Sequence, residues 1–175
     1  MAILQRGGVP VIDDTADGSA GSGLMHHKFV VIDGREVVTG SSNFTASGMH
    51  GDPDAPSTRG NVNHLLRLQS TELAELFREE FDRLWGDGPG GAPDSRFGLA
   101  KESEGLRWVR VGSTPVGVLF APHRRRDERN ALQLLEQQLE KTRDQLDLAL
   151  FVFSDQQLGN VVGALHERGA VSYTH

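Results

Sequence analysis

Cysteine is absent from the 175-residue chain. This absence excludes a disulfide framework, a zinc site built on cysteine thiolates and a cysteine nucleophile. Long hydrophobic runs are absent too: no stretch approaches the roughly 18 apolar residues of a membrane-spanning helix, and residues 1–8 lack the basic-then-apolar layout of a secretory signal. With 37% hydrophobic and 24% charged residues, the sequence as written predicts a soluble globular protein.

A surplus of basic charge is also missing. The formal net charge is −6, and residues 1–90 carry 7 basic against 13 acidic side chains while residues 91–175 carry 11 of each. General nucleic-acid-binding proteins usually have a basic surface, and the one basic cluster in this sequence is Arg124–Arg126. The charge balance therefore disfavours a general nucleic-acid-binding protein.

One short segment stands out against this ordinary composition. Between Met25 and Thr45 the sequence reads MHHKFVVIDGREVVTGSSNFT, which contains the pattern H-x-K-x4-D-x6-G-S-x-N. Because each residue type makes up about 5% of an average protein, six fixed positions arise by chance in a chain of this length roughly once in a hundred thousand sequences or less often. The six positions are His26, Lys28, Asp33, Gly40, Ser41 and Asn43.

The residue types in this pattern favour phosphate chemistry. Along a strand His26 and Lys28 point to the same side, so a bound phosphate would meet an imidazole nucleophile beside an ammonium group. Neutral imidazole is a nucleophile near pH 7, and the ammonium offsets charge as phosphorus becomes five-coordinate. Ser41 and Asn43 can donate hydrogen bonds to phosphate oxygens, and Gly40 permits close backbone approach. This scheme requires no metal.

The pattern resembles the signature of the phospholipase D superfamily, whose members cleave phosphodiesters through a covalent phosphohistidine. The resemblance implies that His26 is the nucleophile or, in a partner site, the general acid. It implies that Lys28, Ser41 and Asn43 bind the substrate phosphate and that Asp33 gives mainly structural support. No metal or other cofactor is expected.

A second resemblance raises the question of how His26 is oriented. Segments 26–29 and 79–85 are similar to the mitochondrial cardiolipin hydrolases and to small nuclease-like members of the superfamily. In those proteins a glutamate on the strand after the motif orients the histidine, and here that position holds Asn63. An amide can accept a hydrogen bond from an imidazole but cannot stabilise an imidazolium through charge. Asp52 and Asp54 could replace this glutamate in orienting His26, but we expect them to be solvated loop residues.

Strands and a helix are predicted around the motif. Segments 29–32 and 36–39 read as a hairpin because Asp33-Gly34 between them is a strong tight-turn signal. Further strands are predicted at 9–12 and 62–68, a loop at 13–23, and a helix at 71–85 with Ser70 as N-cap. His27 and His64 lie outside the motif, and we expect both to be partly buried strand histidines. The expected inner face of the helix is Leu73, Leu76, Phe77, Phe81, Leu84 and Trp85.

The second half predicts another set of elements after a Gly- and Pro-rich linker. Strands are expected at 106–111 and 116–120, a helix at 128–142, a buried strand at 146–153, and a last helix with Ser154 and Gln157 as capping box. This order predicts an α/β fold with a mixed, partly parallel sheet flanked by helices. The expected inward residues are Leu132, Leu135 and Leu139 on the first helix and Leu158, Val161, Val162 and Leu165 on the second.

The motif occurs once, whereas a phosphohistidine mechanism needs a second histidine to protonate the leaving oxygen. Superfamily members obtain it by homodimerisation or from a second repeat in the same chain. By resemblance, residues 1–86 correspond to the closing part of one repeat, 87–105 to a linker and 106–175 to the truncated opening part of the next. We therefore expect a piece of a bacterial two-repeat protein, with a homodimer as the alternative. The tail, residues 170–175, does not fit the strand pattern of the family.

These observations predict a phosphodiesterase of the phospholipase D type that hydrolyses or transfers phospholipid head groups. One alternative is an endonuclease of the same mechanism, which would take nucleic acid as substrate. The other is a catalytically inactive α/β module, because the second motif is missing from the chain.

Overall fold

The computed structural model describes residues 2–13, 23–90, 96 and 100–174. It divides the chain into two compact units, Met1–Pro122 and His123–His175. Both units contain helices and strands, which confirms the predicted α/β class. Most of the loop predicted at 13–23 and part of the linker predicted at 87–105 lie outside the described residues.

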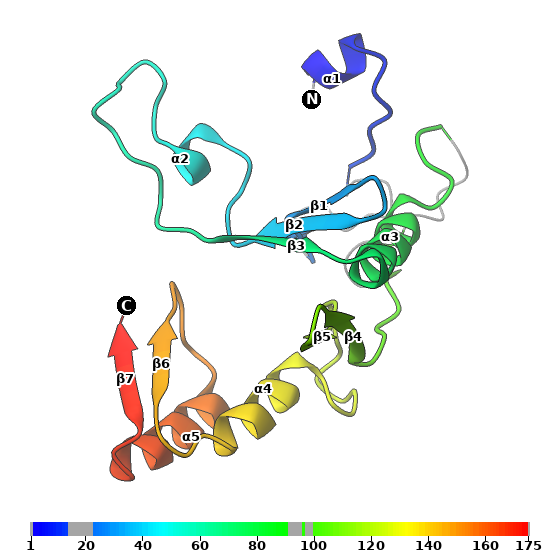
Figure 1. Cartoon of the computed structure of the whole chain (residues 1–175). Helices are drawn as coiled ribbons and strands as arrows, with labels where there is room; N and C mark the ends of the chain where they lie inside the picture. The colour runs from blue at the N-terminus through cyan, green and yellow to red at the C-terminus, as the bar shows by residue number, and fades with distance from the viewer. Residues whose placement is uncertain (1, 14–22, 91–95, 97–99, 175) are drawn as a thin grey trace. The chain divides into compact units, whose positions relative to one another are not determined.

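The first unit is built around a small antiparallel sheet and one long helix (Figure 1). The sheet has the order β1-β2-β3, and a separate hairpin is formed by β4 and β5. The elements are α1 (Ala2–Arg6), β1 (Phe29–Ile32), β2 (Glu36–Gly40), α2 (Ala46–Met49), β3 (Leu65–Gln69), α3 (Thr71–Trp85), β4 (Arg107–Val111) and β5 (Thr114–Val118).

The β1–β2 hairpin forms as its turn residues predict. Asp33 and Gly34 both have positive φ, 52° and 62°, as a tight hairpin turn of the primed type requires. The turn fixes the register in which Ile32 lies opposite Glu36 and Phe29 opposite Thr39. The prediction of this hairpin is confirmed.

Helix α3 begins where its N-cap signal predicts. The Ser70 hydroxyl accepts a hydrogen bond from the Leu73 N–H at 3.2 Å, which satisfies one of the free donors of the first turn. The buried residues of the helix are Leu73, Ala74, Leu76, Phe77, Glu80 and Leu84. The prediction that Phe81 faces the core is wrong: it is 45% exposed and stacks on Trp85.

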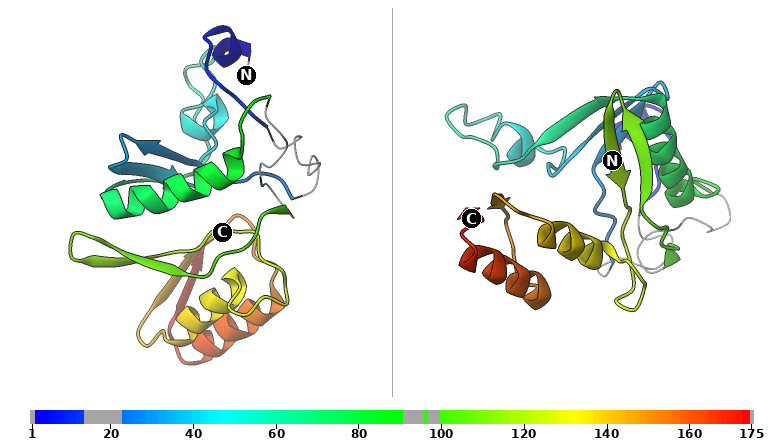
Figure 2. Two further views of the ribbon diagram at one scale, coloured as in Figure 1. Left: turned by 90° about the vertical axis from the view of Figure 1, so that its right-hand side faces the viewer. Right: turned by 60° about the horizontal axis from the view of Figure 1, so that its bottom comes forward.

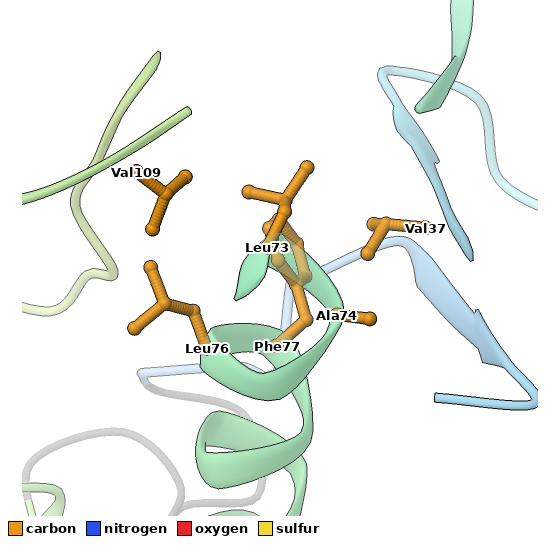
Figure 3. Packing of buried hydrophobic residues seen from close by; sticks show 6 residues of the cluster. All are labelled: Val37, Leu73, Ala74, Leu76, Phe77 and Val109. Atoms are coloured by element: carbon orange, nitrogen blue, oxygen red, sulfur yellow. The ribbon is translucent and has the colours of Figure 1, made fainter. Parts of the chain in front are cut away.

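The core of the first unit lies on two sides of α3. Figure 3 shows Ala74 toward Val37 of β2 and Leu76 toward Val109 of β4. The helix contacts β1 and β2 on one side and β4 on the other, so the β4–β5 hairpin belongs to the same packing unit as the motif hairpin. Burial of these apolar side chains is the main force that holds the three pieces together.

The second unit pairs two helices with two strands. It contains α4 (Ala131–Glu140), β6 (Leu146–Ala149), α5 (Gln156–Glu167) and β7 (Val171–Thr174). Helix α5 contacts both α4 and β7, and β6 and β7 form a two-stranded parallel sheet (Figure 2). The predicted inner face of α5 is confirmed, because Leu158 and Leu165 are buried and Val161 and Val162 pack beside them.

Several sequence predictions differ from the structure. Residues 9–12 form no strand, and the strand predicted from residue 62 begins at Leu65. Strand β6 ends at Ala149 and its residues are partly buried or exposed, and Phe151 beyond it is 97% exposed, so the prediction of a buried strand over 146–153 is wrong. On α4, Leu139 is buried whereas Leu132 and Leu135 are exposed. These segments have apolar or β-branched residues but pack against too little of the unit to be covered.

The sheet arrangement is also simpler than predicted. The described strands form three small sheets rather than one mixed sheet, and their parallel pairing is confined to β6 and β7. Asp155, not Ser154, caps α5, because its carboxylate accepts from the Leu158 N–H at 2.9 Å. The compact units divide after Pro122, whereas the predicted repeat boundary lies in 87–105. The assignment of the two parts to different repeats stays a prediction. Within the described residues, no helix is long and apolar enough to cross a membrane.

Candidate active site

The two halves of the motif meet at one end of the β1–β2 hairpin. The antiparallel register pairs the first residue of β1 with Thr39, so residues just before β1 lie at the same end as residues just after β2. His26 and Lys28 come before β1, and Ser41 and Asn43 come after β2. The Thr39 hydroxyl donates to the Lys28 carbonyl at 3.0 Å and joins the two segments directly.

His26 and Lys28 precede the strand on which they were expected. Strand β1 begins at Phe29, and exposure does not alternate before it: His26 is exposed, whereas His27 and Lys28 are both partly buried. The Lys28 ammonium donates to the His26 carbonyl at 2.7 Å, which fixes the cation beside the backbone of the histidine. Partial burial lowers the pKa of Lys28 from its ordinary value.

Ser41 and Asn63 form one hydrogen-bonded group. The Ser41 hydroxyl donates to the Asn63 side-chain oxygen at 2.8 Å and accepts from the His64 N–H at 3.2 Å. The Asn63 amide nitrogen donates to the Gly48 carbonyl at 3.1 Å. Asn63 thus supports Ser41 in this structure, and its predicted role in orienting His26 stays a prediction. To donate to a phosphate oxygen, the Ser41 hydroxyl would have to turn away from Asn63.

Two glycines allow the loop after β2 to fold closely. A Cβ atom on Gly40 would lie 2.1 Å from the His64 carbonyl oxygen, and one on Gly48 would lie 2.3 Å from the Asn43 carbonyl oxygen. The Ser42 hydroxyl is buried beneath this loop and lies 2.9 Å from the Gly48 carbonyl oxygen. The backbone at Gly40 therefore lies close to the backbone at His64, and glycine at this position allows the loop that carries Asn43 to fold as it does.

Asp33 lies at the opposite end of the hairpin from His26. It occupies the turn with a positive φ, and its carboxylate pairs with Arg35 at 3.3 Å in an exposed position. This placement agrees with a structural contribution to the turn. Asp52, Asp54 and His64 are exposed, so His64 is not the partly buried strand residue that was expected. In the described parts of the chain, no three His, Asp or Glu side chains are grouped so that they could hold a metal ion.

Comparison with known proteins shows what the first half of the chain resembles. A family model described as "Cardiolipin synthase, PLD-like domain" matches residues 1–85. Residues 1–85 are therefore similar to a phospholipase D-like domain. The matched segment ends at the last residue of α3 and contains the whole motif.

The curated relatives of this phospholipase D-like segment are mitochondrial cardiolipin hydrolases. The protein from Mus musculus is 32% identical over 85 residues, 49% of this chain and 32% of its own length. That from Xenopus laevis is 35% identical over 82 residues, 47% of this chain and 32% of its own length. That from Chlamydomonas reinhardtii is 38% identical over 61 residues, 35% of this chain and 23% of its own length. The chain thus spans about a third of the length of the first two relatives. No solved structure matches it significantly.

A buried ionic cluster contacts His27, the residue between His26 and Lys28 of the motif. The Glu80 carboxylate of α3 has no exposed side-chain surface, and one of its oxygens lies 3.1 Å from the Lys101 ammonium and 3.4 Å from Nδ1 of His27. Its other oxygen accepts from Arg83 at 2.8 Å, and Arg83 also pairs with Glu104. Lys101 and Glu104 lie beyond residue 85, so this cluster includes residues outside the matched segment.

The pKa values of Glu80 and His27 in this cluster are shifted in opposite directions. Burial raises the pKa of Glu80, although the nearby charges of Lys101 and Arg83 counteract it. Burial lowers the pKa of His27, the positive charge of Lys101 lowers it further, and a hydrogen bond with the Ala121 backbone opposes them. A low pKa favours neutral imidazole at His27 near pH 7.

Sequence analysis missed this cluster although one signal was present. Glu80 follows Leu73 by seven residues and Phe77 by three, so it occupies the same helical stripe as the apolar inner face. A glutamate on that stripe must find buried partners, because an unpaired buried charge is very costly. Lys101 had no comparable signal, since it lies in a Gly- and Pro-rich segment without periodicity.

Proposed function

We propose that the motif end of the β1–β2 hairpin is one half of a phosphodiesterase site that acts on phospholipid head groups by hydrolysis or transfer. His26 is the nucleophile, and Lys28, Ser41 and Asn43 bind the phosphate. The observation that carries the proposal is the hairpin register, which places the His-x-Lys segment and the Gly-Ser-x-Asn segment at the same end of the sheet.

The proposed reaction has two steps with a covalent intermediate. The neutral imidazole of His26 attacks phosphorus, and the bond between phosphorus and the leaving oxygen breaks as a second imidazolium gives that oxygen a proton. The second imidazole then takes a proton from water, whose oxygen attacks phosphorus and breaks the phosphorus–nitrogen bond. An alcohol in place of water gives transfer. The ammonium of Lys28 stabilises the added negative charge in both steps.

The second imidazole has to come from another motif. Two sources are consistent with this proposal: His26 of a second copy of the chain, related by a two-fold axis, or a motif in a second repeat. A phospholipid substrate is favoured because the curated relatives are named as cardiolipin hydrolases and because the first ninety residues are acidic rather than basic.

The test is an assay of the full chain on vesicles of cardiolipin, vesicles of phosphatidylcholine and single-stranded DNA. We expect lipid turnover that falls by about 10⁴-fold or more in His26→Ala, because the nucleophile is lost. His166→Ala is the matched control, since His166 is an exposed histidine of the second unit. Quenching in denaturant at alkaline pH, where the phosphorus–nitrogen bond survives, should leave the phosphatidyl group of the substrate on His26. Sizing of the active species should show whether two copies are required.

Each alternative function corresponds to a different result of the same assay. Turnover of DNA without turnover of lipid would replace the lipid proposal with an endonuclease of the same mechanism. Activity of the unaltered chain no higher than that of His26→Ala would identify an inactive α/β module. Lipid turnover without a label on His26 would contradict the covalent step.

A further inference from the structure

The ion pair between Glu80 and Lys101 is among the most deeply buried polar contacts of the first unit. The two side chains are 0% and 1% exposed, and Nζ of Lys101 lies 3.1 Å from the nearer Glu80 oxygen. The Lys101 ammonium also donates to the Ala121 carbonyl at 2.9 Å. Three separate parts of the chain, α3 and the segments on either side of the β4–β5 hairpin, are thereby joined at one point.

His27 connects this point to the motif. Its Nδ1 lies 3.4 Å from the same Glu80 oxygen, and its side chain is 21% exposed. Its ring lies against Phe29 and Phe120 at centroid distances of 6.0 and 5.7 Å, and both phenylalanines pack edge-on against Phe77. The His27 ring is therefore held between aromatic side chains and the Glu80 carboxylate, while its neighbour His26 is exposed.

Stability alone is a weak reason for such a pair. Removing two charges from water costs several kcal/mol per ion, and buried ion pairs are often replaced by apolar side chains without loss of stability. A buried ion pair can, however, fix the orientation of the side chains around it, because its charges tolerate few other arrangements. The side chain oriented here is that of His27, which lies in the sequence between the proposed nucleophile His26 and the proposed phosphate-binding Lys28.

We infer that Glu80 and Lys101 are positioning residues: they fix His27 from behind so that His26 and Lys28 are held toward the substrate phosphate. The catalytic part of this inference rests on the proposed function. Its structural part does not, because it concerns how firmly residues 26–28 are held. Lys101 lies outside residues 1–85, which the family model matches, so the support of the motif comes partly from residues that follow that segment.

The test removes both charges at once in the full chain. Glu80→Leu with Lys101→Met leaves no unpaired buried charge at these two positions and keeps apolar volume, so the chain should remain folded. The matched control is Glu75→Gln with Lys141→Met, which alters one exposed glutamate and one exposed lysine. If the first double variant unfolds, Glu80→Gln with Lys101→Met takes its place, because glutamine keeps the shape of the glutamate side chain and neither position then carries a buried charge.

Two readouts do not depend on activity. Amide hydrogen exchange of a peptide covering residues 24–33 should rise by at least about threefold, while exchange in α5 stays unchanged. The imidazole NMR titration of His27, assigned with His27→Gln, should differ from that of the unaltered chain, because the double variant removes two charged groups beside its ring, Glu80 and Lys101. The groups that face or influence His27 in this titration are Glu80, Lys101, Lys28, His26 and the Ala121 backbone.

The third readout is turnover of the lipid vesicles. A misplaced nucleophile should lower kcat by about tenfold or more and leave KM within about twofold. A folded variant with exchange and titration like those of the unaltered chain would overturn the inference, and so would changed exchange with full turnover. If exchange and titration change but the unaltered chain turns over no lipid, the positioning is supported and the proposed function has failed.

Discussion

Helix α3 has an ionic cluster on each of two faces, and the two clusters differ in almost every physical respect. On the exposed face Arg78 pairs with Glu75 at 2.7 Å and with Asp82 at 2.5 Å. On the buried face Glu80 pairs with Arg83 from the same helix and with Lys101 from a later segment. The exposed cluster is local, at spacings of three and four residues, whereas the buried cluster joins distant parts of the chain.

The difference shows that distance alone does not reveal what an ion pair does. Water and salt screen the exposed cluster, so its short contacts add little to the free energy of unfolding. The buried cluster is screened far less, and losing one partner leaves the remaining buried charge only partly compensated in surroundings that solvate it poorly. The two faces therefore predict very different responses to equally simple substitutions.

The largest effect should follow removal of one buried partner. Lys101→Met leaves the Glu80 carboxylate with Arg83 as its remaining cation, and we expect the free energy of unfolding to fall by about 3–5 kcal/mol. Urea unfolding at pH 7.5 measures this change, with Lys141→Met as the control for loss of an exposed lysine. A loss no greater than that of the control would mean that the two faces of α3 do not differ as proposed.

A smaller effect should come from the start of the helix, which serves both faces equally. Ser70→Ala removes the hydroxyl that accepts from the Leu73 N–H and should lower the free energy of unfolding by about 1 kcal/mol. The same urea experiment measures it, and Ser57→Ala, at an exposed serine, is the control. Equal unfolding midpoints for the two variants would show that the cap does not stabilise α3.

The buried face should also give the chain an acid sensitivity. Because the pKa of His27 in the folded chain lies below 6.5, the unfolded chain binds this proton first as pH falls. The free energy of unfolding should therefore decrease from about pH 6.5 downward. The pKa of Glu80 is raised above 4.5, so that group acts in the opposite sense: its contribution to stability is present at low pH and is lost as pH rises.

His27→Gln isolates the histidine contribution to this acid sensitivity. The variant should show a smaller decrease in the free energy of unfolding between pH 7.5 and 5.5 than the unaltered chain. His166→Gln, which changes an exposed histidine, should keep the original slope. Identical slopes for the unaltered chain and His27→Gln would refute the assignment of this titration to His27.

The smallest effect should follow removal of the exposed cluster. Arg78→Ala breaks the contacts with both Glu75 and Asp82, yet the urea midpoint should stay within experimental error because water solvates all three groups. Repeating the measurement in 1 M salt should change nothing further. A destabilisation comparable with that of Lys101→Met would remove the distinction between the two faces.

Local signals in the sequence account for the parts that were predicted well. Ser70 and the apolar spacing after it define α3 within one helical segment, and Asp33-Gly34 determines the β1–β2 hairpin through backbone conformation. The placement of His26 and Lys28 at the same end of the hairpin as Ser41 was predictable for the same reason, because it is a consequence of that turn. The exposed apolar residues near Phe151 were predicted wrongly because strand propensity does not specify what covers a strand.

Non-local contacts account for what sequence analysis did not find. The burial of Glu80 depends on Lys101, and the environment of His27 depends on Phe120 and the Ala121 carbonyl, all of them later in the chain. A pattern of spacings within one element carries no information about such partners. The position of Glu80 on the helix could have identified it as an inner-face residue. Its partners could not have been identified in this way, because Lys101 lies outside the helix.

The separation of these contacts along the chain also implies an order of events during folding. The hydrogen bond from Thr39 to the Lys28 carbonyl spans 11 residues, so it can form as soon as the β1–β2 hairpin closes, on a timescale of about 1–10 μs. The Lys101–Ala121 contact spans 20 residues and lies far downstream. On a ribosome the motif would therefore emerge and close its hairpin before Lys101 and Ala121 are synthesised. Residues 26–28 would be fully ordered only once residue 121 had left the exit tunnel.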